Sequence, residues 1–277
     1  MKFLICQEVS DEIEEGSRIL KELADYAQTM TRQEIDASEL IVGMKCGGSD
    51  GLSGITANPA VGRFSDRLIS LGGSTVLTEV PEMFGAESIL FERCENEEIF
   101  NKAVKMINDF KHYFVSHGQV VYENPSPGNK EGGITTLEDK SCGCVQKGGS
   151  AQIVDVLNYA EPVTKKGLNV LSGPGNDLVS STVLTASGAH LILFTTGRGT
   201  PFGAPAPTVK ISTNTALFEK KNGWIDFNAG TAAEGEPLDE TGERLLDFVL
   251  EVASGKRTKT EERGFREISI FKDGVTL

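Results

Sequence analysis

Apolar residues recur along the chain at two spacings, one typical of helices and one of buried strands. Helical spacing predicts amphipathic helices at residues 11–30, 59–71, 82–93, 97–117, 177–188 and 239–253, and Asn214 is placed to cap a further short helix. Short apolar runs predict strands at residues 39–45, 74–79, 168–171, 190–195, 208–212, 224–227 and 267–271, with one more strand-like run at residues 3–5. The alternation predicts an α/β fold, in which a mainly parallel sheet carries helices on both faces and Gly-rich loops follow the strands.

Residues 123–149 interrupt this alternation, because they are poor in apolar side chains and rich in Gly, Pro, Asn and Ser. A short linker can have this composition, but a polar loop of this length inside a compact protein is more often functional. We therefore predict a first α/β lobe at 1–122, a polar functional segment at 123–150 and a second lobe at 151–277. The alternative is one continuous domain over residues 1–277.

The 277 residues suffice for one large domain or two smaller ones, and the 39% of hydrophobic residues is ordinary for a soluble protein. A formal net charge of -13 argues against a nucleic-acid partner, because phosphate contacts need clustered Lys and Arg. No apolar run is long enough to cross a membrane. The five Cys are an odd number and no secretory signal precedes them, which favours a reducing, cytoplasmic location.

Ligands of parallel α/β sheets bind outside the carboxyl ends of the strands, so the loops that follow strands are the candidates for a site. Four such loops are Cys46–Asp50, Glu79–Glu82, Gly173–Asp177 and Thr195–Thr200. The first offers a thiol, a hydroxyl, a carboxylate and free N–H groups just before a helix, a set that can hold an anion or present metal ligands. A tight turn in which Asp50 only hydrogen-bonds to the backbone is equally compatible with this loop.

Two other loops carry charged side chains at strand ends. Glu79 and Glu82 flank Pro81, and paired carboxylates can bind a divalent cation or share acid–base work. Glu82 by itself is more typical of an exposed helix start, whereas Glu79 ends an apolar strand. Arg198 stands between two glycines after another apolar strand, where its guanidinium can hold a substrate carboxylate through two hydrogen bonds.

The cysteine pair and the histidines favour structural roles. Cys142 and Cys144 lack the spacing of a zinc ribbon or a thioredoxin motif, so we predict that they pack at a turn. His112, His117 and His190 show no ligand-pair spacing. Because histidine is the usual general base, a lysine, a carboxylate or a group from elsewhere must serve here.

A series of stretches, in order and over nearly the whole chain, resembles the altronate dehydratase and galactarate dehydratase family. They are residues 43–50, 53–59, 123–130, 132–136, 146–149, 173–177, 194–201, 210–214 and 224–230. The resemblance implies removal of water from a hexonate or hexarate to give a 2-keto-3-deoxy sugar acid, with a divalent metal that is iron(II) or, alternatively, manganese(II). The stretches 146–149 and 173–177 look closer to altronate than to galactarate enzymes. The same family includes sulfolactate sulfo-lyase large subunits.

In this family a further catalytic segment with a His- and Cys-containing motif precedes the matching region. We therefore expect the chain to need that N-terminal segment or a companion subunit, to act within a homo-oligomer and to show little activity alone. One alternative is a non-catalytic subunit that binds sugar acids or serves as a scaffold. Another is a nucleotide-binding protein, against which the absence of a GxGxxG or Walker A loop argues.

The resemblance leads to specific hypotheses about roles. Cys46 or Asp50 is the expected metal ligand, with Glu79 near the metal, and the metal would stabilise the enediolate formed when the α-proton leaves. The expected catalytic residues, which exchange protons or stabilise charge, are Lys130, Lys147 and Glu79. The expected substrate-binding residues are Arg198, Ser49, Asn176, Asp177 and Thr136. We further expect the loops 46–50, 130–136, 173–177 and 195–200 to converge on one cleft.

Overall fold

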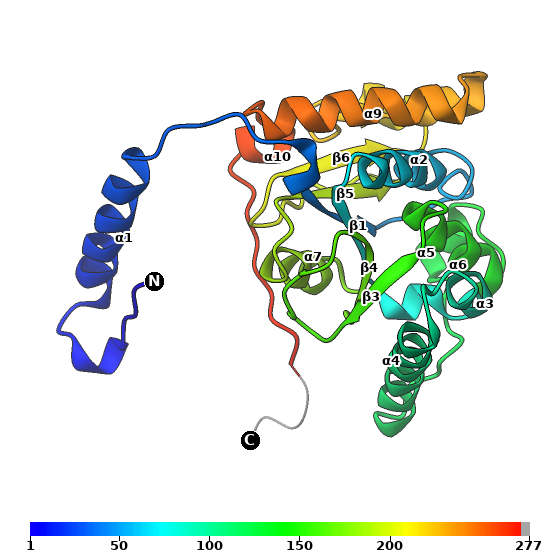
Figure 1. Ribbon diagram of the computed structural model, residues 1–277, viewed down its shortest axis with the longest axis horizontal. Helices are drawn as coiled ribbons and strands as arrows, with labels where there is room; N and C mark the ends of the chain where they lie inside the picture. Colours follow the sequence, from blue (N-terminus) through cyan, green and yellow to red (C-terminus); the bar gives the residue numbers. More distant parts are fainter. Residues whose placement is uncertain (273–277) are drawn as a thin grey trace. The chain divides into compact units, whose positions relative to one another are not determined.

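The computed structural model describes residues 1–272 and divides into two compact units, Met1–Asp36 and Ala37–Leu277 (Figure 1). The first unit holds a 3-10 turn, η1 (Cys6–Glu8), and the helix α1 (Glu12–Gln28). Asp11 caps α1, since its carboxylate accepts hydrogen bonds from the N–H groups of Ile13 and Glu14. The predicted strand at residues 3–5 is wrong, because none of residues 1–36 forms a strand with which it could pair.

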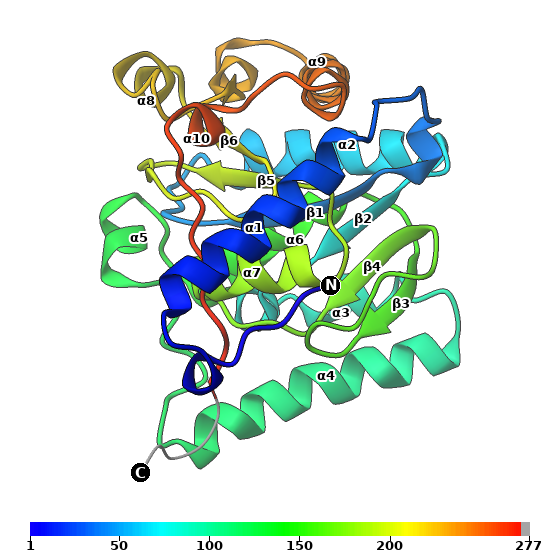
Figure 2. The same ribbon diagram turned by 90° about the vertical axis from the view of Figure 1, so that its left-hand side faces the viewer.

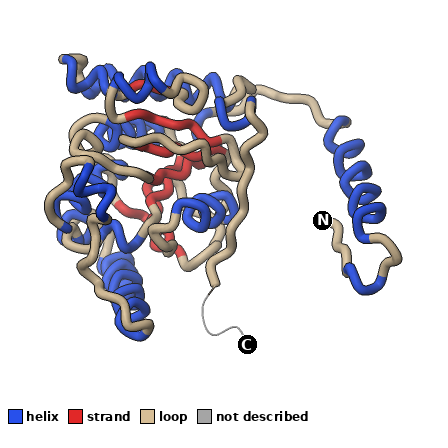
Figure 3. The backbone as a smooth tube through the Cα atoms, turned by 180° about the vertical axis from the view of Figure 1, so that it is seen from behind, coloured by secondary structure: helices blue, strands red, loops and turns tan. Residues whose placement is uncertain are grey.

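The second unit is built around a seven-stranded sheet in which every pairing is parallel, which confirms the α/β fold. Figure 3 shows this sheet in red, with helices around it. The strand order is β3-β4-β2-β1-β5-β6-β7. The strands are β1 (Ile41–Cys46), β2 (Ser74–Leu77), β3 (Ile153–Leu157), β4 (Gly167–Leu171), β5 (Leu191–Thr196), β6 (Thr208–Ser212) and β7 (Phe227–Asn228). Strands β1 and β2 of the predicted first lobe lie between β4 and β5 of the predicted second lobe, so both lobes contribute to one sheet.

Two differences from the predicted strands have a physical cause. β3 was not predicted, because Asp155 interrupts its apolar run; the carboxylate of Asp155 lies 3.7 Å from the ammonium groups of Lys102 and of Lys165 at this edge of the sheet. The predicted strand at 267–271 is wrong. Its backbone N–H groups donate to Gly203 O, a threonine hydroxyl and a tyrosine hydroxyl instead of to a neighbouring strand.

Helices cover both faces of the sheet (Figures 1 and 2). One face packs against α2 (Ala57–Ser70), α4 (Glu97–Ser116) and α9 (Leu238–Ala253), and the other against α7 (Asp177–Ala186). Side chains of β1 alternate between the two: Val42 and Met44 join the α2 core, whereas Gly43 faces Leu184 of α7. The same alternation turns Lys45 toward α7 and Cys46 toward the opposite face.

The polar segment 123–150, predicted to be a loop, is largely helical. It contains α5 (Pro127–Glu131), α6 (Leu137–Val145) and the 3-10 turn η4 (Gln146–Gly148), and Ser126 and Thr136 cap the two helices. The prediction failed because α6 and η4 turn polar side chains, Lys140 and Lys147, toward the interior.

The remaining elements connect these layers. They are η2 (Ala37–Glu39), η3 (Val80–Met83), α3 (Glu87–Phe91), α8 (Thr215–Lys220), η5 (Gly230–Glu234) and α10 (Lys259–Glu262). The predicted helix 82–93 is therefore divided into η3 and α3, and Asn214 caps α8 as predicted. Among residues 1–272, none of the helices has the length and apolar character of a membrane span.

Candidate active site

A cavity of about 260 Å³ lies outside the carboxyl ends of β1, β2 and β5. The end of β1, the turn η3 after β2, the start of α7 after β4 and the loop after β5 all reach it. The polar or ionisable side chains at its wall that matter here are Cys46, Ser49, Glu82, Lys140, Asp177 and Arg198. This is the edge of a parallel sheet where ligands are expected.

Lys45, at the end of β1, is fully buried on the α7 side of the sheet. Its ammonium group lies 2.6 Å from Asp177 Oδ1, 3.2 Å from Glu79 Oε1 and 3.0 Å from Ser180 Oγ. Burial alone disfavours the charged form, but the two carboxylates raise the pKa of Lys45 above its usual value. The ammonium group therefore stays charged and joins β1 to β2 and α7.

Glu79 holds the backbone after β2 in an unusual conformation. Its φ of 71° and ψ of 61° place a non-glycine residue in the left-handed region, which costs on the order of 1–3 kcal/mol. The carboxylate is buried, and Oε2 accepts a hydrogen bond of 2.8 Å from the N–H of Cys46. Burial raises the pKa of Glu79 to about 8, and the nearby Cys46 thiolate adds to the shift.

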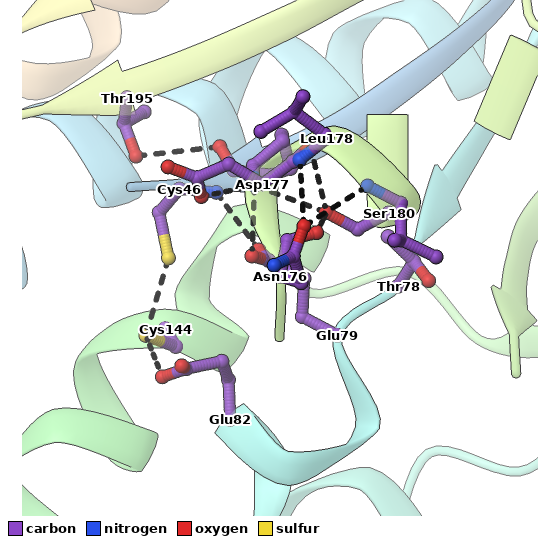
Figure 4. Close-up of polar contacts among 12 residues, drawn as sticks. Cys46, Thr78, Glu79, Glu82, Cys144, Asn176, Asp177, Leu178, Ser180 and Thr195 are labelled. Atoms are coloured by element: carbon purple, nitrogen blue, oxygen red, sulfur yellow. Dashed lines mark hydrogen bonds and ion pairs between the residues drawn. The ribbon is translucent and has the colours of Figure 1, made fainter. Parts of the chain in front are cut away.

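A single helical face brings three further groups to the site. Lys140, Cys144 and Lys147 follow one another at i, i+4 and i+7 on α6 and η4. The ammonium of Lys140 lies 2.6 Å from Glu82 Oε2, and that of Lys147 lies 3.1 Å from Cys46 Sγ. Cys144 Sγ lies 3.5 Å from Cys46 Sγ and 3.6 Å from Glu82 Oε2 (Figure 4).

These contacts fix the charges of the cluster. Burial opposes ionisation of Glu82, yet the ammonium of Lys140 and the Asn124 amide hold its pKa below the usual value. Burial likewise opposes protonation of Lys140, but Glu82 and the two sulfur atoms raise its pKa. The hydrogen bond from Cys144 and the ammonium of Lys147 lower the pKa of Cys46. The cavity wall therefore combines an ionised carboxylate with ammonium groups, an arrangement suited to proton transfer and to stabilising an anion.

The raised pKa of Glu79 predicts how the stability of the protein depends on pH. The folded state keeps the Glu79 proton up to about pH 8, whereas the unfolded chain releases it near pH 4.5, so stability falls as pH rises between these values. Glu79→Gln should flatten the free energy of unfolding between pH 5 and 8 by up to about 1.4 kcal/mol per pH unit. Urea denaturation at each pH measures this slope.

Glu236→Gln provides a control of opposite sign. Hydrogen bonds from Arg244 lower the pKa of Glu236 to about 2, so the stability it contributes is lost only below about pH 4.5. This substitution should therefore shift the free energy of unfolding by a constant amount between pH 5 and 8. An unchanged slope in Glu79→Gln would mean that Glu79 is already ionised in the folded protein at pH 5.

The structure brings six of the ten predicted site residues into this region. Cys46, Ser49, Asp177 and Arg198 line the cavity, and the buried Glu79 and Lys147 lie behind Cys46. Their individual roles stay predictions.

The other four predicted residues have different surroundings. Lys130 is exposed on α5, and Asn176 and Thr136 use their side-chain oxygens to cap α7 and α6. Asp50 lines a second cavity of about 200 Å³. Of the four loops expected to converge, 46–50, 173–177 and 195–200 reach the first cavity. The loop 130–136 instead accepts a hydrogen bond at Gly132 O from the N–H of Gly51, the residue that follows the loop 46–50, and Ile134 lines the second cavity.

Four residues of the site were not predicted: Lys45, Glu82, Lys140 and Cys144. The prediction that Glu82 is an exposed helix start is wrong, because its side chain is only 13% exposed and pairs with Lys140. Cys144 lies buried on a helix rather than at a turn. Two signals in the sequence pointed to these residues: the single charge of Lys45 in the apolar run 41–46, and the i, i+4, i+7 spacing on α6 and η4.

The residues of this chain do not by themselves fit a divalent metal. The predicted ligand Asp50 accepts hydrogen bonds from Ser53, Thr213 and Asn214, whereas Cys46 faces Cys144 and Lys147. The most suitable donors are Cys46, Cys144 and Glu82, but the ammonium groups of Lys147 and Lys140 lie against two of them. Within residues 1–272, no three Cys, His, Asp or Glu side chains are arranged to hold a metal ion.

Comparison with known proteins gives one consistent result. The family model described as D-galactarate/Altronate dehydratase, C-terminal, matches residues 37–276. The altronate dehydratases of Bacillus subtilis (strain 168) and Escherichia coli (strain K12) are 59% and 56% identical over 100% and 99% of this chain, and 56% of each relative is covered. The galactarate dehydratase (L-threo-forming) of Escherichia coli (strain K12) is 41% identical over 87% of this chain and 47% of its own length. The chain thus spans about half the length of the curated relatives it matches.

Proposed function

The chain belongs to the D-galactarate/altronate dehydratase family, and from this we propose that its cavity binds a sugar acid from which a hydro-lyase removes water. One observation carries the proposal: the Glu82–Lys140 ion pair and the Arg198 guanidinium line the same cavity at the carboxyl ends of the strands. The greater identity to altronate dehydratases supports a hexonate like altronate as the substrate, and a 2-keto-3-deoxy sugar acid as the product.

The reaction needs a base, an acid and positive charge. We assign the base to Glu82, which is ionised and takes the proton from the carbon next to the substrate carboxylate. Lys140 holds a proton at the same wall of the cavity and gives it to the hydroxyl that leaves from the following carbon. The two transfers release one water and leave an enol, which becomes the keto acid.

Positive charge around the cavity stabilises the enediolate that forms when the proton leaves. Arg198 is half-exposed at the rim and can hold the substrate carboxylate. Lys147 and Lys45 are buried behind the wall and are already oriented by Cys46, Glu79 and Asp177. Groups fixed before the substrate arrives need no reorganisation during the reaction, which makes their charge effective.

A divalent cation, Fe(II) or Mn(II), remains part of the proposal as a cofactor of the complete reaction. When bound, such an ion would add Lewis-acid stabilisation of the enediolate. The chain itself contributes the lysine ammonium groups described above.

The test is formation of 2-keto-3-deoxy acid from altronate, galactarate and other sugar acids, with Fe(II), Mn(II) or a chelator present. Calorimetric titration of the same acids measures binding in parallel. Binding with turnover supports the proposal, and binding without turnover supports the alternative of a sugar-acid-binding subunit. Absence of both would overturn the assignment of this cavity.

Arg198→Lys should weaken sugar-acid binding about tenfold, on the order of 1.4 kcal/mol. Lysine keeps the charge but loses the planar pair of donors that matches a carboxylate. The matched control is Lys130→Met, which removes an exposed cation of α5 outside the cavity wall. Calorimetry should show little change in that variant, and a larger loss with Lys130→Met than with Arg198→Lys would reverse the two assignments.

A further inference from the structure

Two cysteines from distant parts of the chain meet in the interior. Cys46 ends β1 and Cys144 lies on α6, and their sulfur atoms are 3.5 Å apart (Figure 4). Both are buried, whereas Cys6 is exposed and Cys94 and Cys142 are half-buried. The two residues are 98 positions apart in the sequence, and their sulfur atoms contact each other directly, which distinguishes them from a single cysteine that only fills space in the core.

Each of the two sulfur-bearing residues borders a cavity. Cys46 lines the candidate site of about 260 Å³, and Cys144 lines the neighbouring cavity of about 200 Å³. Lys140 and Ser49 belong to the walls of both. A molecule as small as hydrogen peroxide fits the candidate site, where Cys46 forms part of the wall.

We propose that Cys46 and Cys144 form a reversible disulfide when the protein meets a hydroperoxide. The Cys46 sulfur, 3.1 Å from the Lys147 ammonium, attacks one peroxide oxygen and the O–O bond breaks, so that Cys46 becomes a sulfenic acid and the departing hydroxide takes the thiol proton and leaves as water. The Cys144 sulfur then attacks the sulfenic sulfur, and a second water leaves. In balance, two thiols and one hydrogen peroxide give one disulfide and two waters.

The geometry favours this pair over other combinations. A disulfide needs a sulfur separation of about 2.05 Å, so the two atoms must approach by roughly 1.5 Å, which small side-chain and helix adjustments can supply. Cys142 precedes Cys144 by two residues on the same helix, so its side chain points away from the face that carries Cys144.

Disulfide formation changes the charges at the candidate site. It removes the Cys144 thiol from Glu82, 3.6 Å away, and the Cys46 thiolate from Lys147. The Lys147 ammonium, 3.9 Å from Glu79, then loses its nearest anionic partner. The oxidised protein therefore has a differently charged cavity wall, and a reductant restores the original one.

Peptide mapping tests the proposal directly. The purified chain is treated with hydrogen peroxide, blocked with an alkylating agent and cleaved with trypsin, which yields the peptides 46–63 and 141–147. We expect these two peptides to be joined, with a loss of 2 hydrogen atoms in mass and release by dithiothreitol. Cys144→Ser should abolish the product, whereas Cys142→Ser, in the same peptide, should retain it.

The same experiment distinguishes the Cys46–Cys144 disulfide from other oxidation products. Oxidation of Cys46 to sulfinic acid in the wild-type chain, or a bond between Cys142 and Cys144 inside peptide 141–147, would overturn the proposal. Circular dichroism of both serine variants confirms that they fold. This test is independent of dehydratase activity, so it distinguishes failure of the disulfide from failure of the proposed function.

Discussion

Lys45→Met should lower the free energy of unfolding by about 3–5 kcal/mol above about pH 8, where Glu79 is ionised, because this is the usual effect of removing one partner from a buried ion pair. Methionine fills much of the same space, so the loss reports charge rather than a cavity. Without the ammonium group, Asp177 loses a partner at 2.6 Å and Glu79 loses one at 3.2 Å. Glu79 must then keep its proton or remain a buried charge, so the loss should grow above about pH 8, where Glu79 ionises in the wild type.

Lys210→Met is the matched control. Lys210 lies on β6, is also fully buried, and its ammonium stands 4.6 Å from the same Phe194 ring that Lys45 approaches at 4.8 Å. It donates to the carbonyl of Thr200 rather than to a carboxylate, and burial lowers its pKa to about 7. Between about pH 10.5 and 7 the unfolded chain protonates Lys210 and the folded protein does not, so the stability of the wild type falls as pH falls through this range. Methionine removes this effect, so Lys210→Met should destabilise the protein little, or stabilise it, near pH 7.

Urea denaturation of both variants measures the difference, and a double mutant separates the cause. Lys45→Met combined with Glu79→Gln should recover part of the lost stability, because the second change removes the carboxyl group that lost its partner. Equal losses in Lys45→Met and Lys210→Met would show that burial of the side chain, and not the ion pair, determines the effect.

The fold was largely predictable because most strands are short segments with several apolar side chains and are buried on both faces. β6 was predicted with its observed bounds, and β1 to within two residues. The pattern of apolar residues within one segment does not show, however, whether that segment pairs with another strand. The run 267–271 has a strand-like pattern but finds no neighbouring strand, whereas β3 pairs with β4 although Asp155 interrupts its pattern.

The candidate site was predictable only in part, because its polar groups face inward. Helical periodicity usually places charges toward solvent, so α6, with Lys140 buried, does not show the expected pattern. Loops were predicted as the source of the site, and Cys46, Ser49, Asp177 and Arg198 do lie on or beside them. The partners that set the protonation of these groups come from a strand interior and a helix face, which only the three-dimensional arrangement brings together.

Glu82→Gln should lower kcat of the proposed dehydration by about 10²–10⁴-fold, the range expected for loss of a positioned base. Glutamine keeps the size of the side chain and a hydrogen-bonding oxygen, so the contacts of Glu82 with Lys140 and Asn124 can persist in weakened form. The affinity for the sugar acid should change far less than kcat, because the carboxylate is needed when the proton moves and not when the substrate binds.

The pH dependence distinguishes a base from a residue that only positions Lys140. Lys140 holds the pKa of Glu82 below its usual value, so a base role predicts that the wild-type rate falls only at acidic pH, as Glu82 becomes protonated. This acidic limb should disappear in Glu82→Gln. Lys140→Gln should instead shift the limb to higher pH, because the carboxylate loses the ammonium group that favours its ionised form. If Glu82→Gln lowers kcat but keeps the wild-type limb, another group takes the proton, and the Cys46 thiolate at the same wall becomes the next candidate.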